Sequence, residues 1–125
     1  MPKVNNEKIK ELVKISKKAR QLMVEALIRA GCGHPGGAFS SVDLMTALYF
    51  SIMKIDPKNP RWEERDRFIL SKGHSSVALY SILCLRGFLK EETLFTFRQD
   101  GSVFRCHPDM HNGLGIDAST GSLGH

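Results

Sequence analysis

Three histidines lie in separate turns that contain glycine or proline, and histidine is the side chain best suited to move protons near neutral pH. The turns are GCGHPGGAFSS (31–41) with His34, SKGHSS (71–76) with His74, and FRCHPDMHNG (104–113) with His107. A fourth turn, STGSLGH (119–125), follows them. Rigid loops that hold imidazoles commonly position an acid, a base or an oxyanion donor. The pattern therefore predicts one site assembled from several turns.

The first element that must support these turns is a long helix over residues 6–30. Apolar side chains recur there at the three-and-four spacing of a single helix face. Asn5 or Asn6 can cap its start, and Gly31 fits just past its end.

A second helix is expected after Ser41, because Ser40 and Asp43 fit a capping-box pattern ahead of the apolar run LMTALYFSIM. A third helix over 75–86 is apolar nearly all round, which predicts that it is buried, much of it against chain beyond His125 or against a partner. A short helix is expected over 90–98.

The run DRFILSKG (66–73) favours β structure and predicts a strand that ends in the turn of His74. Helices around a strand indicate an α/β fold, with a parallel sheet flanked by helices. A lone strand cannot satisfy its own backbone hydrogen bonds, so the expected domain looks incomplete.

Composition indicates one globular domain or part of one. The chain has 125 residues, of which 42% are hydrophobic and 25% are charged. No apolar run is long enough to span a bilayer, and the first residues have no hydrophobic region of a secretory signal. Cys32, Cys84 and Cys106 form no CxxC pair, which favours free thiols in a reducing compartment. A cytoplasmic location is expected.

The net charge of +5 comes entirely from residues 1–30, which hold eight Lys or Arg against three Glu. Such a basic helix could bind nucleic acid or an anionic membrane. The helix contains no interleaved aromatic residues and no DNA-reading motif. A solvated helix face, or one that meets an acidic partner, is the favoured interpretation, with no nucleic-acid or membrane partner.

The first turn matches GxGxxG at Gly31, Gly33 and Gly36. A dinucleotide site needs a strand before this motif, whereas a helix precedes it here. The remaining interpretations are a loop whose glycines let the backbone approach a ligand, which we favour, and a purely structural helix–helix turn.

The segment FILSKGHSS is more specific. A strand, a glycine turn and a helix start place backbone amides near Ser75, Ser76 and Val77 where they could bind a phosphate or diphosphate. The structural alternative is simple N-capping by Ser75 or Ser76.

A zinc set could be drawn from cysteines and histidines of two turns, but their spacings match no paired-ligand pattern. The residues considered are Cys32, His34, Cys106, His107 and His111. No metal ligand is predicted within this chain.

Four segments, in order, resemble the N-terminal region of transketolase: HPGGAFSSVDLMTALYF, DRFILSKGHSSVALYSIL, FRQDGSVFRCHPD and STGSLGH. The HPGGAFS form is most similar to the N-terminal subunit of split transketolases. Deoxyxylulose-phosphate synthase is a related but poorer match, because its histidine loop differs. The resemblance implies that residues 1–125 belong to an α/β pyrophosphate-binding domain. It also implies a thiamin diphosphate enzyme that transfers a two-carbon glycolaldehyde unit between sugar phosphates.

The resemblance also implies roles for the histidines as catalytic residues. His34 and His107 would line the substrate channel and donate to substrate hydroxyls or to a developing oxyanion. His74 would lie close to the cofactor diphosphate and the reacting carbon. The cofactor is the electron sink in such enzymes, and imidazoles suit the accompanying proton transfers.

The last turn resembles the family's GPLG turn, whose backbone contacts the cofactor. Gly121, Ser122 and Leu123 are the matching residues, with Ser122 in place of proline. His125 stands where the family usually has glutamine, which puts that contact in doubt. The Mg²⁺ or Ca²⁺ ligands of the family, a Gly-Asp-Gly segment and an asparagine, are expected downstream of this chain.

The activating glutamate is expected in a C-terminal transketolase subunit or domain, and a homo-oligomer is expected because the family binds its cofactor between subunits. The chain would then be a fragment or a truncated gene product, inactive alone. The rival hypotheses are a non-catalytic interaction module that docks through its basic helix, a deoxyxylulose-phosphate synthase-like fragment and, more weakly, a small nucleic-acid binder.

Overall fold

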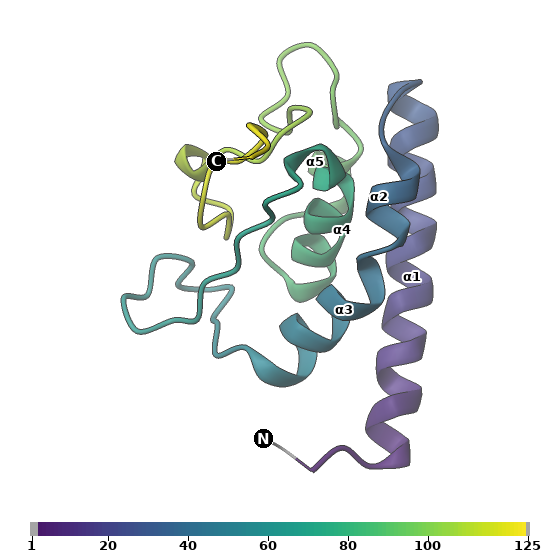
Figure 1. Cartoon of the computed structure of the whole chain (residues 1–125), viewed down its shortest axis with the longest axis vertical. Coiled ribbons are helices and arrows are strands. Elements are labelled where there is room, and N and C mark those ends of the chain that lie inside the picture. Colours follow the sequence, from purple (N-terminus) through teal and green to yellow (C-terminus); the bar gives the residue numbers. More distant parts are fainter. Residues whose placement is uncertain (1–2, 125) are drawn as a thin grey trace.

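Helix α1 (Asn6–Ala30) runs along one side of the molecule, and the rest of the chain packs against it (Figure 1). The computed structural model describes residues 3–124. The Asn5 side chain accepts a hydrogen bond from the backbone N–H of Lys8 at 2.9 Å and caps the helix. Gly31, with φ 70°, ends it by donating its N–H to the carbonyls of Leu27 and Ile28. The helix has the bounds and caps that its sequence predicts.

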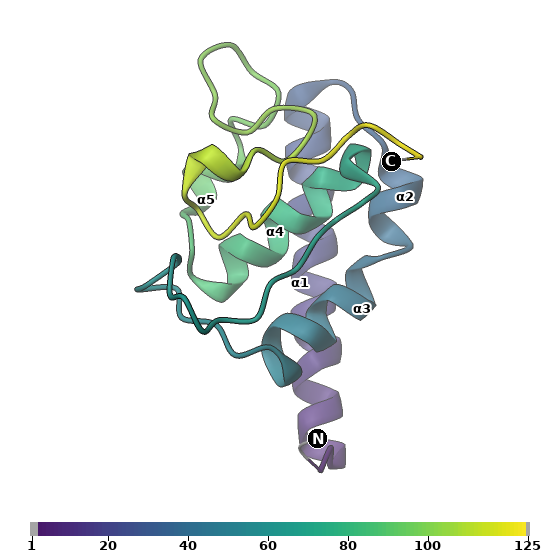
Figure 2. The same cartoon turned by 60° about the vertical axis from the view of Figure 1, so that its left-hand side comes forward.

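The other elements are short helices and helical turns, and α4 crosses α1 in the middle of the molecule (Figure 2). They are α2 (Pro35–Phe39), α3 (Val42–Ala47), the π-helical turn η1 (Leu48–Ile52), the 3₁₀ turn η2 (Gly73–Ser75), α4 (Ser76–Arg86), α5 (Glu91–Leu94) and the 3₁₀ turn η3 (Met110–Asn112). No helix within residues 3–124 is both long enough and apolar enough to cross a membrane.

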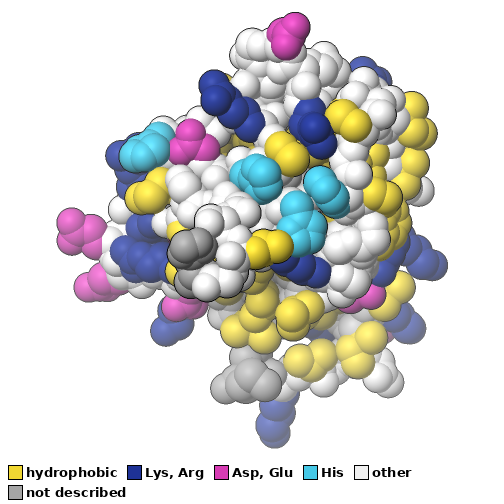
Figure 3. Space-filling view, turned by 45° about the horizontal axis from the view of Figure 1, so that its top comes forward, with side chains coloured by type: hydrophobic (Ala, Val, Ile, Leu, Met, Phe, Trp, Pro, Cys, Tyr) yellow, Lys and Arg dark blue, Asp and Glu magenta, His cyan; other side chains and the backbone are white. Residues whose placement is uncertain are grey.

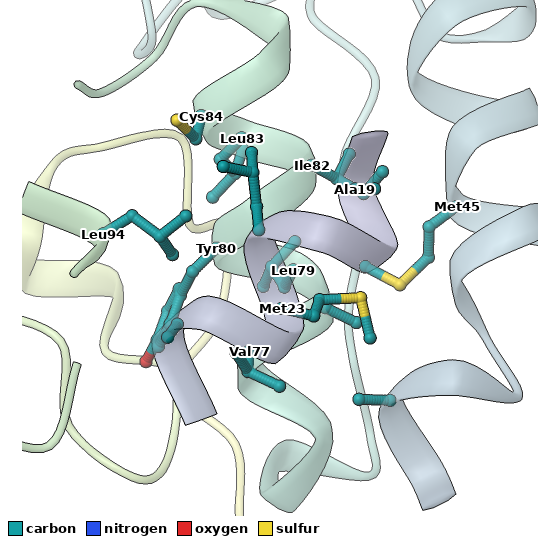
Figure 4. Close-up of a cluster of buried hydrophobic side chains, with 14 of the residues drawn as sticks. Ala19, Met23, Met45, Val77, Leu79, Tyr80, Ile82, Leu83, Cys84 and Leu94 are labelled. Carbon is teal, nitrogen blue, oxygen red and sulfur yellow. The ribbon is translucent and has the colours of Figure 1, made fainter. Parts of the chain in front are cut away.

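Helix α4 forms the centre of the hydrophobic core (Figure 4). Its side chains from Ser76 to Cys84 are all buried, and they pack against α1, α3 and α5. The core side chains labelled in the figure are Ala19, Met23, Met45, Val77, Leu79, Tyr80, Ile82, Leu83, Cys84 and Leu94. Each large apolar side chain buried in this way contributes about 1.5–3 kcal/mol. This chain therefore covers α4 by itself and needs no partner to do so.

The strand expected over 66–73 is not formed. Residues 66–70 carry no regular structure, and residues 73–75 form the 3₁₀ turn η2. The Asp66 N–H donates to the carbonyl of Lys54 at 2.9 Å, and the Phe68 N–H donates to the carboxylate of Asp117 at 2.8 Å. A strand needs a continuous ladder with a second strand, and no strand occurs among residues 3–124. The parallel sheet of the expected α/β fold is therefore not confirmed, whereas its helical part is present.

The capping box expected at Ser40 and Asp43 is also wrong. Ser40 Oγ donates to the carbonyl of Gly37 at 2.9 Å, and α3 begins at Val42 without a side-chain cap. Asp43 instead pairs with Arg20 of α1, with 2.8 Å between Oδ2 and Nη2. The Asp43 carboxylate therefore binds Arg20 of α1 and does not cap α3 as the local sequence pattern predicts. The short helix expected over 90–98 is likewise reduced to α5.

Candidate active site

The imidazoles of His34 and His74 meet edge to face. Their ring centroids lie 5.3 Å apart at an interplanar angle of 70°. His34 is exposed at the N-cap of α2, where Pro35 occupies the first helical position, and His74 is half-buried in η2. Figure 3 shows histidine side chains gathered on one face of the molecule, with Lys or Arg and hydrophobic side chains around them. Two of the predicted turns therefore bring their histidines together.

Gly37 explains how closely these two turns approach. A Cβ built at this position would lie 2.5 Å from Ser75 Oγ and 3.5 Å from His74 Nε2. Since real Cβ atoms essentially never come within 3.0 Å of a neighbour, a side chain at position 37 would force Ser75 Oγ or α2 to shift. The glycine is thus required by packing against His74 and its neighbour.

His107 packs against the last turn in a similar way. A Cβ at Gly121 would lie 2.8 Å from both Cγ and Cδ2 of His107, and the φ of Gly121 is +139°. Gly73 lies against the same turn. A Cβ built at Gly73 would lie 2.8 Å from the backbone nitrogen of Gly121 and 2.8 Å from the carbonyl carbon of Thr120. Through these two glycines, the last turn, described over 119–124, touches both the turn 71–76 and the turn 104–113.

Two hydroxyl groups of α4 fix the backbone that precedes His107. Ser76 Oγ donates to the carbonyl of Cys106 at 2.6 Å, and Tyr80 OH donates to the carbonyl of Arg105 at 3.1 Å. The Tyr80 ring also packs on Phe104, with 4.4 Å between ring centroids. Burial raises the pKa of the Tyr80 hydroxyl, so it remains a donor at neutral pH. The buried core helix thus carries the turn that presents His107.

The last turn is tied to the same framework. The Thr120 N–H donates to the carbonyl of Pro108 at 3.3 Å, and the Met110 N–H donates to Ser119 Oγ at 3.0 Å. Upstream, the nearly buried carboxylate of Asp117 accepts hydrogen bonds from the Arg65 guanidinium at 2.9 and 3.1 Å. A buried ion pair of this kind specifies one arrangement more than it adds stability.

Two buried hydroxyls beside these turns have no hydrogen-bond partner within residues 3–124. They are Ser75 Oγ and Thr120 Oγ1. Ser75 makes no cap bond to α4, and Ser76 uses its hydroxyl on Cys106, so the simple N-capping alternative for these serines is wrong. Buried hydroxyls are normally satisfied. Their free hydrogen-bonding capacity is what a site for a polar ligand would provide.

The structure brings His34, His74, His107 and Gly121 into one cluster of turns. Ser122 and Leu123 follow Gly121 on the surface, where Leu123 is 64% exposed. His125 lies outside the described residues.

His111 is exposed in η3 and is not part of this cluster. Within residues 3–124, no group of three His, Cys, Asp or Glu side chains is arranged to hold a metal ion.

The sequence motifs did not single out Lys72, Thr120, Gly37 or Gly73, which make the contacts between the turns. Lys72 and Gly73 stand directly before His74 in the SKGHSS motif, and this adjacency is the one signal that could have found them.

A cavity of about 680 Å³ lies beside this cluster and is not lined by the three histidines. It follows the loop from Arg98 to Cys106, and its lining includes Arg98, Arg105, Asp100 and Asp109. The two arginines and the two aspartates balance, so the lining carries no excess of charge.

Comparison with known proteins places these features in a family. The sequence profile described as "Transketolase, thiamine diphosphate binding domain" matches residues 11–125. The 6-deoxy-6-sulfo-D-fructose transketolase subunit SqwG of Clostridium sp. (strain MSTE9) is 49% identical over 105 residues, which cover 84% of this chain and 38% of that protein. One of the subunits of the apulose-4-phosphate transketolase of Phocaeicola vulgatus is 43% identical over 110 residues, which cover 88% of this chain and 39% of that protein.

A solved structure shows the same likeness. The transketolase from Leishmania mexicana superposes with a TM-score of 0.82 at 30% identity, over 90% of this chain and 17% of that one. The chain thus spans at most 39% of the length of each of these three proteins.

Proposed function

The chain belongs to the transketolase family, in its thiamine diphosphate-binding domain, and on this premise we propose that it is the cofactor-binding, N-terminal part of a transketolase. The proposed reaction transfers a two-carbon glycolaldehyde unit from a ketose phosphate to an aldose phosphate. In this proposal residues 1–125 are part of the pyrophosphate-binding domain. The convergence of His34, His74 and His107 on one cluster of turns is the observation that carries it.

The residues present fit a compact polar group such as thiamin diphosphate. The free hydroxyls of Ser75 and Thr120 are buried beside the turns, and Gly37 and Gly121 let these turns pack closely around them. His74, with the backbone of residues 121–123, would hold the cofactor. When bound, thiamin diphosphate supplies the electron sink that lets a carbon–carbon bond next to a carbonyl break and form.

The contribution of this chain is to hold and move protons around the substrate. His34 and His107 would donate their ring N–H groups to substrate hydroxyls and to the oxygen on which negative charge develops. His74 would do so nearest the cofactor. The edge-to-face contact of His34 with His74, and the packing of His107 on Gly121, restrict the orientations of these rings. Such preorganisation lowers the cost of reaching the reactive geometry.

We propose that the metal ion, Mg²⁺ or Ca²⁺, is held by residues outside this chain's 125 residues. The two relatives described above are named as transketolase subunits, which supports a partner subunit or domain that completes the site. A homo-oligomer built from two such units is part of the proposal. Three free cysteines support a reducing, cytoplasmic setting.

The proposed substrates are anionic sugars. The relatives' names specify a sulfonated sugar in one case and a sugar phosphate in the other. Both are small polyhydroxylated molecules with one anionic end, and ring N–H donors suit their hydroxyls. In this proposal, the partner region determines whether the substrate carries a phosphate or a sulfonate group.

Reconstitution tests the proposed function. The natural chain is combined with its partner region, thiamin diphosphate and Mg²⁺, and transfer is followed from xylulose 5-phosphate to ribose 5-phosphate and from a sulfonated ketose to the same acceptor. We expect transfer from at least one ketose, with an absolute requirement for the cofactor. Cofactor-independent activity, or no transfer from either ketose by a folded assembly, would contradict the proposal.

A further inference from the structure

Lys72 links the two turns that hold His34 and His74 by two hydrogen bonds. Its Nζ donates to the carbonyl of Gly37 at 2.8 Å and to Ser40 Oγ at 3.0 Å. We propose that Lys72 is a positioning residue, which fixes the separation of the two imidazoles by anchoring α2 to the turn of His74. This inference rests on the proposed function only for its effect on catalysis.

The carbonyl of Gly37 is the point at which this anchor acts. It accepts hydrogen bonds from Ser40 Oγ at 2.9 Å and from Ser41 Oγ at 3.0 Å, in addition to the bond from Lys72. The backbone N–H groups of Ser40 and Ser41 are directed to Gly36 and Ala38 instead. Among the described residues, the Gly37 carbonyl is therefore held by side chains alone, and of these Lys72 comes from another turn and carries charge. Hydrogen bonds from a charged donor are roughly twice as strong as neutral ones.

The same residue that Lys72 holds is the one against which His74 packs. A Cβ at Gly37 would lie 3.5 Å from His74 Nε2, so the α2 backbone forms one wall beside this imidazole. His34 lies at the opposite end of α2, where its carbonyl accepts the N–H of Ala38 at 3.3 Å. A shift of α2 would therefore change the spacing of His34 and His74 directly.

The link is short and partly buried. Lys72 is half-buried and lies two residues before His74, at the N-cap of η2, where its own carbonyl accepts the N–H of Ser75 at 2.9 Å. The side chain thus spans between two segments that are 35 residues apart in the sequence. α2 has only five residues, and so short a helix is not stable without tertiary contacts. Loss of this link should loosen α2 more than the rest of the fold.

The first test compares Lys72→Met with wild type in the assembled enzyme. Methionine keeps the length of the side chain and removes the donor. We expect kcat to fall by about 10-fold to 100-fold, because a misplacement of about 1 Å can cost roughly 10²-fold. KM for the ketose should change by much less than kcat, since Lys72 is not placed in contact with substrate. Lys72→Arg, which keeps a cationic donor, should recover part of the loss.

A second readout does not depend on activity. Hydrogen–deuterium exchange of the peptide that contains α2 should become faster in Lys72→Met, while exchange in α4 stays as in wild type. Lys58→Met is the matched control, because the Lys58 side chain is exposed and makes no hydrogen bond or ion pair within the described chain. It should change neither readout. Ser40→Ala removes one of the two acceptors of the Lys72 ammonium group. Exchange in α2 should therefore increase less in Ser40→Ala than in Lys72→Met.

The outcomes separate this inference from the proposed function. Unchanged exchange in α2 of both Lys72→Met and Ser40→Ala would overturn the positioning role, whatever the activity. A rise in KM without a fall in kcat would also overturn it and would assign Lys72 to substrate binding. If the wild-type assembly shows no transfer, the proposed function fails, and the exchange comparison still decides whether Lys72 anchors α2. If Lys72→Met fails to fold, exchange in α2 of Ser40→Ala decides: faster exchange than in wild type supports the anchor, and unchanged exchange overturns it.

Discussion

Gly121 lies against the imidazole of His107, so that a Cβ at position 121 would be 2.8 Å from two of its ring carbons. This contact joins the turn proposed to hold the cofactor to the turn that presents a catalytic candidate. Gly73 makes the equivalent contact between the last turn and the turn of His74. Close packing through glycine thus connects three turns that are separate in the sequence, and its consequences can be tested one position at a time.

Gly36 and Gly37 provide a matched pair within α2. Gly37→Ala should destabilise the chain by about 1–3 kcal/mol, the range for overpacking, because its Cβ would meet Ser75 Oγ at 2.5 Å. Gly36→Ala meets no atom within 4 Å and should be neutral, or stabilising by up to about 1 kcal/mol. Urea titration measures the free energy of unfolding of each variant.

Ser75→Ala provides the rescue for this pair. It removes the hydroxyl oxygen that the new Cβ would contact, so the double variant Gly37→Ala/Ser75→Ala should regain most of the lost stability. If Gly37→Ala is as stable as Gly36→Ala, α2 is not packed against the turn of His74 as described.

The contact of His34 with His74 predicts coupling between them. In the assembled enzyme each alanine variant should lower kcat/KM by roughly 10²-fold or more, the range for losing a general acid–base group. Because groups that act as a unit are not additive, the double variant should lose much less than the product of the two single losses. Fully multiplicative losses would mean that the two imidazoles act in separate steps.

Asp43 and Arg20 predict a measurable pH dependence of stability. The hydrogen bond from Arg20, assisted by Ser16, lowers the pKa of Asp43 to about 2 from its ordinary value of 3.8. Since the folded-state pKa is depressed, the stabilisation is present above about pH 4 and is lost as pH falls towards 2. The carboxylate is 72% exposed, so screening by solvent limits the effect to about 0.2–1 kcal/mol.

The measurement is a comparison of wild type with Asp43→Asn by urea titration at several pH values. The difference in unfolding free energy should be largest near neutral pH, shrink as the pH is lowered from 4 towards 2, and decrease at high salt. A difference that stays constant across this range would show that the ion pair with Arg20 is not its source.

The three cysteines should differ in reactivity towards iodoacetamide. Burial raises the pKa of the Cys84 thiol to about 11. Cys84 belongs to the hydrophobic core and is only 9% exposed to solvent. Cys32 is exposed, and the thiolate is the reactive form. Mass spectrometry at about pH 8, near the ordinary pKa of a free thiol, should find Cys32 alkylated first and Cys84 protected until the chain is unfolded. Early alkylation of Cys84 in folded protein would contradict the position of α4 in the core.

Helix α1 could be predicted to the residue, because its apolar period and both of its caps lie within the helix or directly beside it. The burial of α4 also followed from its composition. The expected strand could not be judged in this way, because β-favouring residues form a strand only when a second strand pairs with them. The capping box failed for a related reason: Asp43 is held by Arg20, which lies 23 residues away in the sequence.

In the site, too, local features could be predicted from the sequence, whereas tertiary contacts could not. The turns and their histidines were visible in the sequence because glycine, proline and histidine rarely share a tight loop without a cause. The contact of His34 with His74, the anchor at Lys72 and the free hydroxyl of Ser75 depend on tertiary packing. No periodicity or spacing in the sequence could have supplied them.

The most direct test of the account compares His107→Ala with His111→Ala in the assembled enzyme. Both histidines belong to the turn 104–113, but His107 packs against Gly121 of the last turn, whereas His111 is exposed in η3. The measurement is kcat/KM for transfer between a ketose and an aldose phosphate. We expect a loss of roughly 10²-fold or more for His107→Ala and a change within about twofold for His111→Ala. Equal losses at the two positions would contradict it.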